Sequence, residues 1–135
     1  MIASDGEGAT RLLEVQVQGA ESKEDARRIA KNIVESPLVK TAIHGADPNW
    51  GRIIAAAGKD PACRLDPHQL ELYLQGHLLF SQGAPHPDCP RESIIPLLKE
   101  NEVKIVLKLN AGVHAATAWG CDLSRAYIEI NTCYN

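Results

Sequence analysis

The hydrophobic positions of the chain follow two periods, one typical of strands and the other of helices. Residues 12–18 place Leu and Val on one face and Glu and Gln on the other, which predicts a half-buried strand. In residues 23–35 the apolar positions recur every three or four residues, which predicts an amphipathic helix. Ser22 stands three residues before an acid and resembles a helix-capping box. A strand and then a helix therefore open the regular part of the chain.

Two short helices are expected next. Ser36 and Pro37 mark the start of a helix or turn that runs to Gly45. The segment D-P-N-W-G-R (47–52) then leads into the small-residue stretch I-I-A-A-A-G. We expect Asp47 to cap this helix, Pro48 to take its first position, and Gly58 to end it.

The first turn of that helix gathers chemically distinct side chains. Asn49, Trp50 and Arg52 bring an amide, an aromatic ring and a cation to a helix start, where exposed N–H groups favour an anion or a carboxylate. The alternative, which we favour from spacing alone, is a well-capped buried helix whose Trp50 belongs to the core.

The second half of the chain predicts a hairpin, one helix and three strands. The hairpin turns at Gln75-Gly76, and Pro96 is tolerable only in the first turn of its helix. The expected ranges are strands at 69–74, 77–80, 103–109, 115–119 and 127–131, a helix at 93–100, and irregular segments at 61–67 and 81–90. Because strands and helices alternate, the predicted fold class is α/β (α+β): a mixed sheet layered with helices, in a single domain over residues 1–135.

Composition narrows the function classes. With one Phe, two Trp and three Tyr, the core is expected to be aliphatic and alanine-rich, and the net charge of −3 argues against nucleic acid. No apolar stretch approaches the roughly 18 residues that span a bilayer, and Asp5 and Glu7 stand where a signal peptide would be apolar, so we expect a cytoplasmic protein without a membrane partner. The four cysteines form no C-x-x-C pair, which predicts free thiols, and no His or Cys spacing predicts a metal site.

Four residues outside the helices are candidates for chemistry. Glu7 lies between two glycines in D-G-E-G-A-T, a turn that either holds its carboxylate outward or is merely a loop. Thr10 could be a nucleophile if chain cleavage exposed its amine, but a residue entering a strand is the better interpretation. Asn131 offers an amide that both donates and accepts, although a terminal surface residue is the simpler interpretation. Cys121 lacks a visible base and is expected to be a buried thiol.

Taken together, three motifs resemble one family. D-G-E-G-A-T before an alternating strand, D-P-N-W-G-R-I before an Ala-Gly helix, and W-G-C-D-L-S ahead of Y-I-E-I-N occur in this order in the ornithine acetyltransferase family. The resemblance spans residues 5–135 and corresponds to the C-terminal portion of the family's β chain, with the ornithine acetyltransferase/DmpA-like fold.

The resemblance implies a glutamate N-acetyltransferase of arginine synthesis. In this family the precursor cleaves itself before a threonine, which carries acetyl from N-acetylornithine to glutamate in a ping-pong reaction, with an oxyanion hole for the intermediates. The matching positions imply that Glu7 and Asn131 contact the amino-acid substrate. The resemblance implies no cofactor, although acetyl-CoA is a possible second acetyl donor, and D-P-N-W-G-R is implied to be structural.

Several departures predict that this chain alone transfers no acetyl group. The nucleophilic threonine, the substrate-binding lysine and the oxyanion Thr-Gly pair belong to a region absent here. Thr10 is followed by Arg11, unlike the A-T-M-L cleavage pattern, and the family's terminal Ser or Thr would fall one position beyond Asn135. We therefore expect no catalytic residue in this chain, a partner N-terminal half or α chain that carries the nucleophile, and an oligomeric assembly.

Two alternatives stay open at this point. One is a non-catalytic binding or self-association module, in which the strand at 12–18 leaves an exposed edge. The other is a self-processing hydrolase that uses Thr10.

Overall fold

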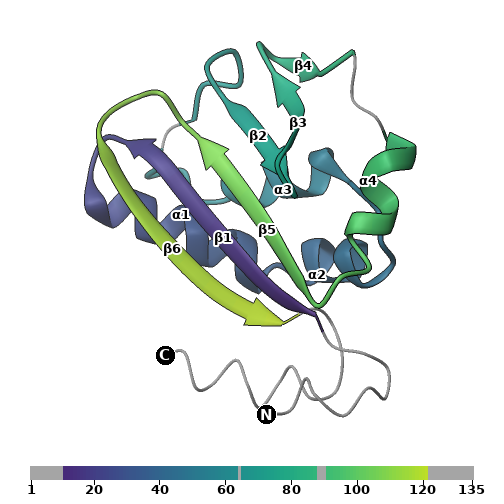
Figure 1. The fold of residues 1–135 in the computed structure, drawn as a ribbon. Coiled ribbons are helices and arrows are strands. Elements are labelled where there is room, and N and C mark those ends of the chain that lie inside the picture. Colours follow the sequence, from purple (N-terminus) through teal and green to yellow (C-terminus); the bar gives the residue numbers. More distant parts are fainter. Residues whose placement is uncertain (1–10, 64, 88–90, 122–135) are drawn as a thin grey trace.

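The part of the chain that the structure describes is built around a six-stranded mixed sheet. The structure, a computed structural model, describes residues 11–63, 65–87 and 91–121. The strands follow the order β4-β3-β2-β5-β1-β6 (Figure 1). Their bounds are β1 Leu12–Ala20, β2 Glu71–Leu74, β3 His77–Ser81, β4 Ala84–Pro85, β5 Glu102–Lys108 and β6 His114–Cys121. The predicted fold class, a mixed sheet layered with helices, is confirmed.

The first strand lies inside the sheet rather than at its edge. β1 pairs in parallel with β5, where Leu12 is opposite Glu102, and antiparallel with β6, where Leu12 is opposite Cys121. Both rows of backbone groups of β1 are therefore paired. The expectation of an exposed edge along residues 12–18 is wrong, because two strands from the far end of the chain return to flank it.

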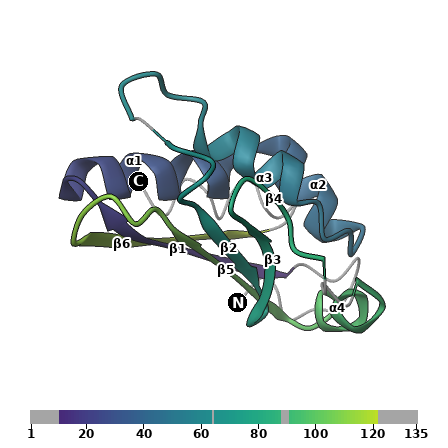
Figure 2. The same ribbon diagram turned by 90° about the horizontal axis from the view of Figure 1, so that it is seen from above.

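Three helices cover one face of this sheet. α1 (Lys23–Glu35), α2 (Pro37–His44) and α3 (Trp50–Ala57) lie together on that side, and Figure 2 shows α4 (Arg91–Leu97) apart from them. Ser22 caps α1 by accepting from the N–H of Asp25 at 3.0 Å, as its spacing predicted. Ser36 caps α2 in the same way.

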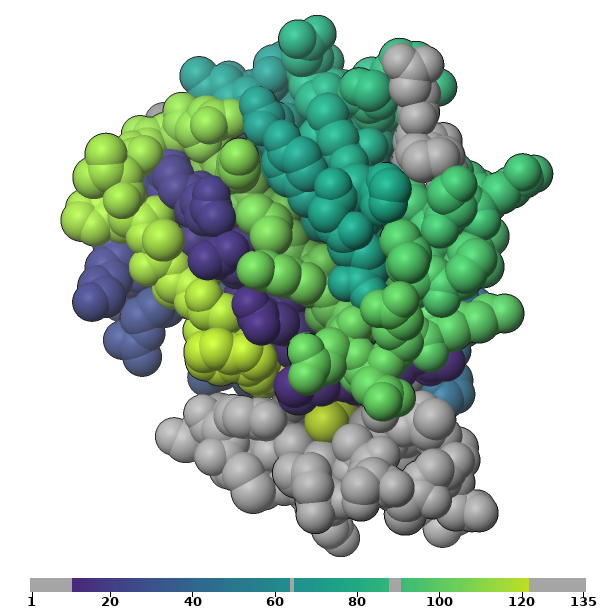
Figure 3. Space-filling model, viewed as in Figure 1, coloured from purple at the N-terminus to yellow at the C-terminus, as the bar shows by residue number. Residues whose placement is uncertain are grey.

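The core between helices and sheet is aliphatic, as composition predicted. From β1 it takes Leu13, Val15 and Val17, all fully buried, and from α1 it takes the predicted apolar stripe that includes Ile29 and Ile33. The alternation in β1 thus sends one set of side chains to the helices and the other set to the opposite face. That opposite face is uncovered by any helix of the described residues, and the side chains of β6, β1, β5 and β2 form its surface (Figure 3).

The hairpin turns as predicted, and a second tight turn follows it. Gln75 and Gly76 have φ of 51° and 82°, and Gln82 and Gly83 repeat this left-handed pair at 53° and 81°. The second turn leads into β4, inside the segment 81–90 expected to be irregular. The prolines in this segment predicted a loop. Pro85 is nevertheless allowed in β4, because β4 is an edge strand of the sheet, where a residue without a backbone N–H donor is tolerated.

Several element boundaries differ from the sequence predictions: β2 starts at Glu71 instead of residue 69, β3 ends at Ser81 instead of residue 80, and β5 spans Glu102–Lys108 instead of 103–109. β6 is longer than 115–119, and β1 continues past residue 18 to Ala20. α4 was expected at 93–100 but spans Arg91–Leu97, so Pro96 stands in its last turn instead of its first. After the helix, the N–H of Lys99 donates to the carbonyl of Pro96, three residues earlier, as in a 3-10 turn. The helix therefore ends close to Pro96, which has no backbone N–H to donate.

The connection from β5 to β6 passes so close to β1 that it requires a glycine. Gly112 donates to the carbonyl of Gly19 at 2.7 Å, and a Cβ at Gly112 would overlap the carbonyl oxygen of Ala20. We predict that Gly112→Ala lowers the free energy of unfolding by about 3 kcal/mol, because backbone must move to relieve the overlap. Urea denaturation measures this change.

The matched control is Gly76→Ala. A Cβ at Gly76 meets nothing within 4 Å, so only the positive φ of 82° opposes it, at a cost of about 1 kcal/mol. Equal losses for the two variants would contradict the close approach at Gly112.

Candidate functional site

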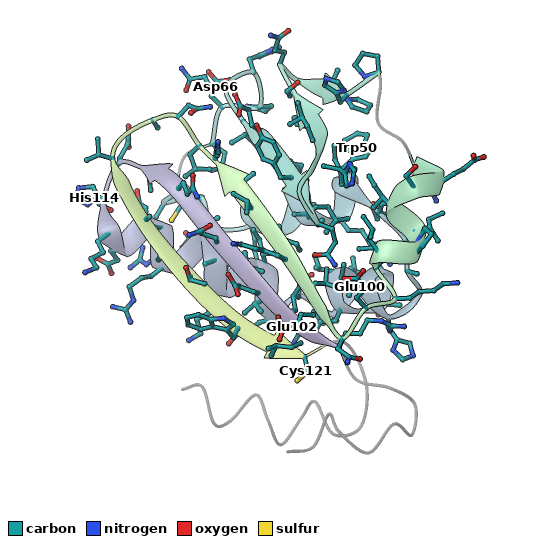
Figure 4. The ribbon with its side chains drawn as sticks, in the orientation of Figure 1. Trp50, Asp66, Glu100, Glu102, His114 and Cys121 are labelled. Atoms are coloured by element: carbon teal, nitrogen blue, oxygen red, sulfur yellow. The ribbon has the colours of Figure 1, made fainter. Side chains whose placement is uncertain are left out.

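The sequence-predicted site residues Glu7 and Asn131 lie outside the described residues, as do Thr10 and the strand expected at 127–131. What the structure places is the pair of points at which their segments join the sheet. The N-terminal segment joins at Arg11, and the C-terminal segment joins at Cys121. Because Leu12 and Cys121 are register partners, both segments join at one corner of the sheet. Figure 4 shows Cys121 at this end, with Glu102 near it and His114 at the far end.

Chain length limits how far each site residue can lie from that corner. Glu7 precedes Arg11 by four residues, and at ~3.6 Å per residue its Cα stays within ~14 Å of that of Arg11. Asn131 follows Cys121 by ten residues, which allows it up to ~36 Å.

Arg11 joins the start of β1 to the end of α2. Its guanidinium donates to the carbonyl of His44, the last residue of that helix, at 3.3 Å. A cation is well placed there because the C-terminal carbonyls of a helix carry partial negative charge. This contact links the residue before β1 to the helical layer.

Lys40 is the functional-site candidate that sequence reasoning missed. It is the one polar or charged side chain found fully buried among the described residues. Burial lowers the pKa of its ammonium to about 8, against the opposing effects of the Glu35 carboxylate and of Cys121 at the corner. The sequence signal was its place in α2, three residues before Ile43, on the buried side of that helix.

A hollow of about 340 Å³ lies on the uncovered side at the same end of the sheet. Glu14, Glu100 and Glu102 contribute carboxylates to it, and Lys104 contributes an ammonium. Figure 4 shows Glu100 and Glu102 at this end of the molecule. Lys104 pairs with Glu14 at 3.7 Å, so part of the acidic charge is already neutralised.

The segment D-P-N-W-G-R begins its helix two residues later than predicted. Asn49, not Asp47, caps α3, because its side-chain oxygen accepts from the N–H of Arg52 at 3.0 Å. Pro48 therefore precedes the helix. The carboxylate of Asp47 instead accepts from Arg91, the first residue of α4, and from the Asn49 amide, each at 3.3 Å.

Trp50 is neither free nor a core residue. Its ring centroid lies 5.2 Å from that of Phe80, and 36% of the residue is exposed. The expectation that Trp50 belongs to the core is wrong, because Trp50 lies in the first turn of α3 and keeps one side of its ring in solvent. Arg52 meanwhile donates to the carbonyl of Leu38 at 3.1 Å, which links α3 to α2. These contacts hold α3 against its neighbours. Gly58 ends α3, as predicted.

The two cysteines in the described ranges are buried thiols. Cys63 and Cys121 are both buried, and Cys63 donates to Asp25 at 3.6 Å. Burial and the Asp25 carboxylate raise the pKa of the Cys63 thiol, which keeps it protonated and unreactive. Over the described ranges, no group of three His, Cys, Asp or Glu side chains is arranged to hold a metal ion. No helix in the same ranges is long and apolar enough to cross a membrane.

Comparison with known proteins identifies relatives over almost the whole chain. The family model described as the ArgJ family matches residues 1–135. The arginine biosynthesis bifunctional protein ArgJ of Dehalococcoides mccartyi (strain CBDB1) is 52% identical over 133 residues, which cover 98% of this chain and 32% of that protein. The protein of the same name from Bacillus subtilis (strain 168) is 50% identical over 134 residues, with the same two coverages.

A solved structure shares the fold. The crystal structure of the arginine biosynthesis bifunctional protein argJ from Bacillus halodurans superposes with a TM-score of 0.82 at 42% identity. The match covers 98% of this chain and 62% of that chain. The chain thus spans about a third of the length of the curated relatives it matches.

Burial of Lys40 predicts a pH dependence of stability. Its pKa is about 8 in the folded protein and 10.5 in the unfolded chain, so between these values the unfolded chain binds more protons. The cost of burying the cation is fully present below pH 8 and is relieved as the pH rises towards 10.5. We expect the free energy of unfolding of the wild type, relative to Lys40→Met, to rise over this window.

Urea denaturation at several pH values across that window measures the difference. Lys31→Met, on the exposed side of α1, is the matched control for the loss of one lysine. A wild-type minus Lys40→Met difference that stays constant with pH would contradict a buried, titrating ammonium.

Proposed function

Because the chain belongs to the ArgJ family, we propose that it is one part of a glutamate N-acetyltransferase of arginine biosynthesis. In this proposal it is the C-terminal part, and it supplies Glu7 and Asn131 to a site whose threonine nucleophile lies outside the chain. The observation that carries the proposal is the family match over residues 1–135 in a chain that spans only 32% of its curated relatives.

The proposed reaction is acetyl transfer through an acyl-enzyme. The threonine hydroxyl attacks the acetyl carbonyl of N-acetylornithine, and collapse of the tetrahedral intermediate releases ornithine with its free amine. The amine of glutamate then attacks the acetyl-threonine ester and leaves as N-acetylglutamate. Acetyl-CoA is a second donor that the same acyl-enzyme chemistry would accept.

The residues of this chain would bind substrate rather than react. Glu7 would accept hydrogen bonds from a substrate ammonium, since an ionised carboxylate forms strong charge-assisted bonds. The amide of Asn131 would both donate and accept, which suits a substrate that carries a carboxylate and an amide. The shared corner of β1 and β6 supports this pairing, because the segments of both residues join the sheet there.

Reconstitution tests the assignment. The chain is combined with an N-terminal part of the family that carries the threonine nucleophile, and acetyl exchange between N-acetylornithine and glutamate is measured. We expect Glu7→Gln and Asn131→Ala each to raise KM for the amino-acid substrates about 10- to 100-fold, the range for a lost hydrogen bond to a charged group.

Glu24→Gln is the matched control, since Glu24 lies on the exposed side of α1 and its carboxylate pairs with Arg28 one turn further along the same helix. Its KM values should equal those of the wild type. If both site variants also kept wild-type KM values in an active complex, Glu7 and Asn131 would not be substrate ligands.

A further inference from the structure

We propose that the uncovered face of the sheet is the docking surface for the part of the enzyme that lies outside this chain. This inference rests on the proposed function, since it requires a longer or two-part enzyme. We call this surface the open face; it consists of Trp119, Glu14, Lys104, Val106, Tyr73 and Lys108 together with the residues that lie opposite them in the same rows of the sheet. Figure 3 views it directly.

Register arranges the open face in rows across the strands. Trp119 is opposite Glu14, and Glu14 is opposite Lys104, which makes one row over β6, β1 and β5. In the next row Val106 of β5 is opposite Tyr73 of β2. Residues opposite one another share a face of the sheet, so these rows lie on the side away from the helices.

Two aromatic rings on the open face are held in place by charged neighbours. The indole N–H of Trp119 donates to the Glu14 carboxylate at 3.3 Å, although 44% of Trp119 is exposed. The hydroxyl of Tyr73 donates to Glu71 at 2.9 Å, and the Lys108 ammonium lies 5.1 Å from the Tyr73 ring centroid. Such pre-oriented Trp and Tyr side chains lose little entropy on association, which is why they dominate binding at interfaces.

The charges of the open face flank a neutral centre. The row that contains Val106 continues through Gln16 to Thr117 without any charged side chain. Glu14 and Lys104 lie in the row on one side, and Lys108 and Glu71 are opposite one another in the row on the other side. A neutral centre between charged flanks is the distribution found at protein interfaces, where charge is depleted from the middle and kept at the rim.

The length of the relatives identifies the occupant. The helical layer already covers the other face of the sheet, whose side chains from β1 are fully buried. The curated relatives contain two further thirds of sequence, and the solved relative continues beyond the shared fold within one chain. That remaining polypeptide needs a surface on this domain, and the open face is the side of the sheet left for it.

Fluorescence of Trp119 tests the proposal, because Trp50 is the only other tryptophan of the chain. Trp50→Phe keeps a ring against Phe80 and leaves Trp119 as the sole indole. The N-terminal part of a family member, with its own tryptophans replaced, is then added to this variant. We expect the Trp119 emission to shift to shorter wavelength and its acrylamide quenching constant to fall at least about threefold. The reciprocal variant Trp119→Phe, which reports on Trp50, should show neither change.

A pair of matched substitutions tests the affinity. Thr117→Arg places a bulky cation in the neutral centre of the open face, whereas Thr41→Arg places the same group on the exposed side of α2. We expect Thr117→Arg to weaken the dissociation constant, measured by sedimentation, at least about tenfold. Thr41→Arg should leave it unchanged.

The outcomes separate this inference from the proposed function. A complex that forms by sedimentation while Trp119 and Thr117→Arg report no change would overturn the open face and leave the two-part enzyme standing. The absence of any complex would overturn both. A Trp119 shift that depends only on the concentration of the chain itself would assign the open face to a second copy and overturn the proposed occupant.

Discussion

The parallel pairing of β1 with β5 is the constraint on which the rest of the structure depends. Two parallel strands start at the same end of a sheet. The chain that leaves the far end of β1 must therefore cross back before β5 can begin. The backbone confirms the return, because the N–H of Leu12 donates to the carbonyl of Asn101 just before β5 begins. β6 then runs antiparallel and ends where β1 starts. One corner therefore gathers chain segments that are far apart in sequence.

That corner combines charge with burial. Arg11 donates to the carbonyl at the end of α2, and Lys40, which belongs to the same helix, is fully buried. Burying an ammonium costs free energy unless neighbouring groups compensate its charge. The presence of one next to the points where the Glu7 and Asn131 segments join the sheet distinguishes this region from the rest of the core. The acid-lined hollow at the same end adds charge of opposite sign.

The two faces of the sheet differ in burial and in charge. The helix-covered face supplies the aliphatic core, and the open face keeps neutral residues between rows of charge with Trp119 and Tyr73 held by carboxylates. The two faces therefore differ in role: one buries the core, and the other is the surface that we propose meets the remaining polypeptide of the family. The D-P-N-W-G-R segment serves the first purpose, since Arg52 links two helices and Asp47 reaches Arg91.

The sequence by itself determined the elements whose signal is local. The period of apolar residues located β1 and α1, Ser22 and Ser36 marked helix starts, and Gln75-Gly76 marked the hairpin, because caps, turns and amphipathic faces depend on neighbours within a few residues. Tertiary structure decided what depends on distant contacts. Asp47 does not cap α3, because Asn49 does so while Asp47 bonds to Arg91. β1 became an interior strand because β5 and β6 return to it, and Lys40 became buried in a helix that packs against α1 and α3. The motifs pointed to Glu7 and Asn131 but did not say where in the fold they lie. The pairing of Leu12 with Cys121 shows that their segments join the sheet at one corner. The sequence alone did not determine this, because the register between distant strands is set by the fold.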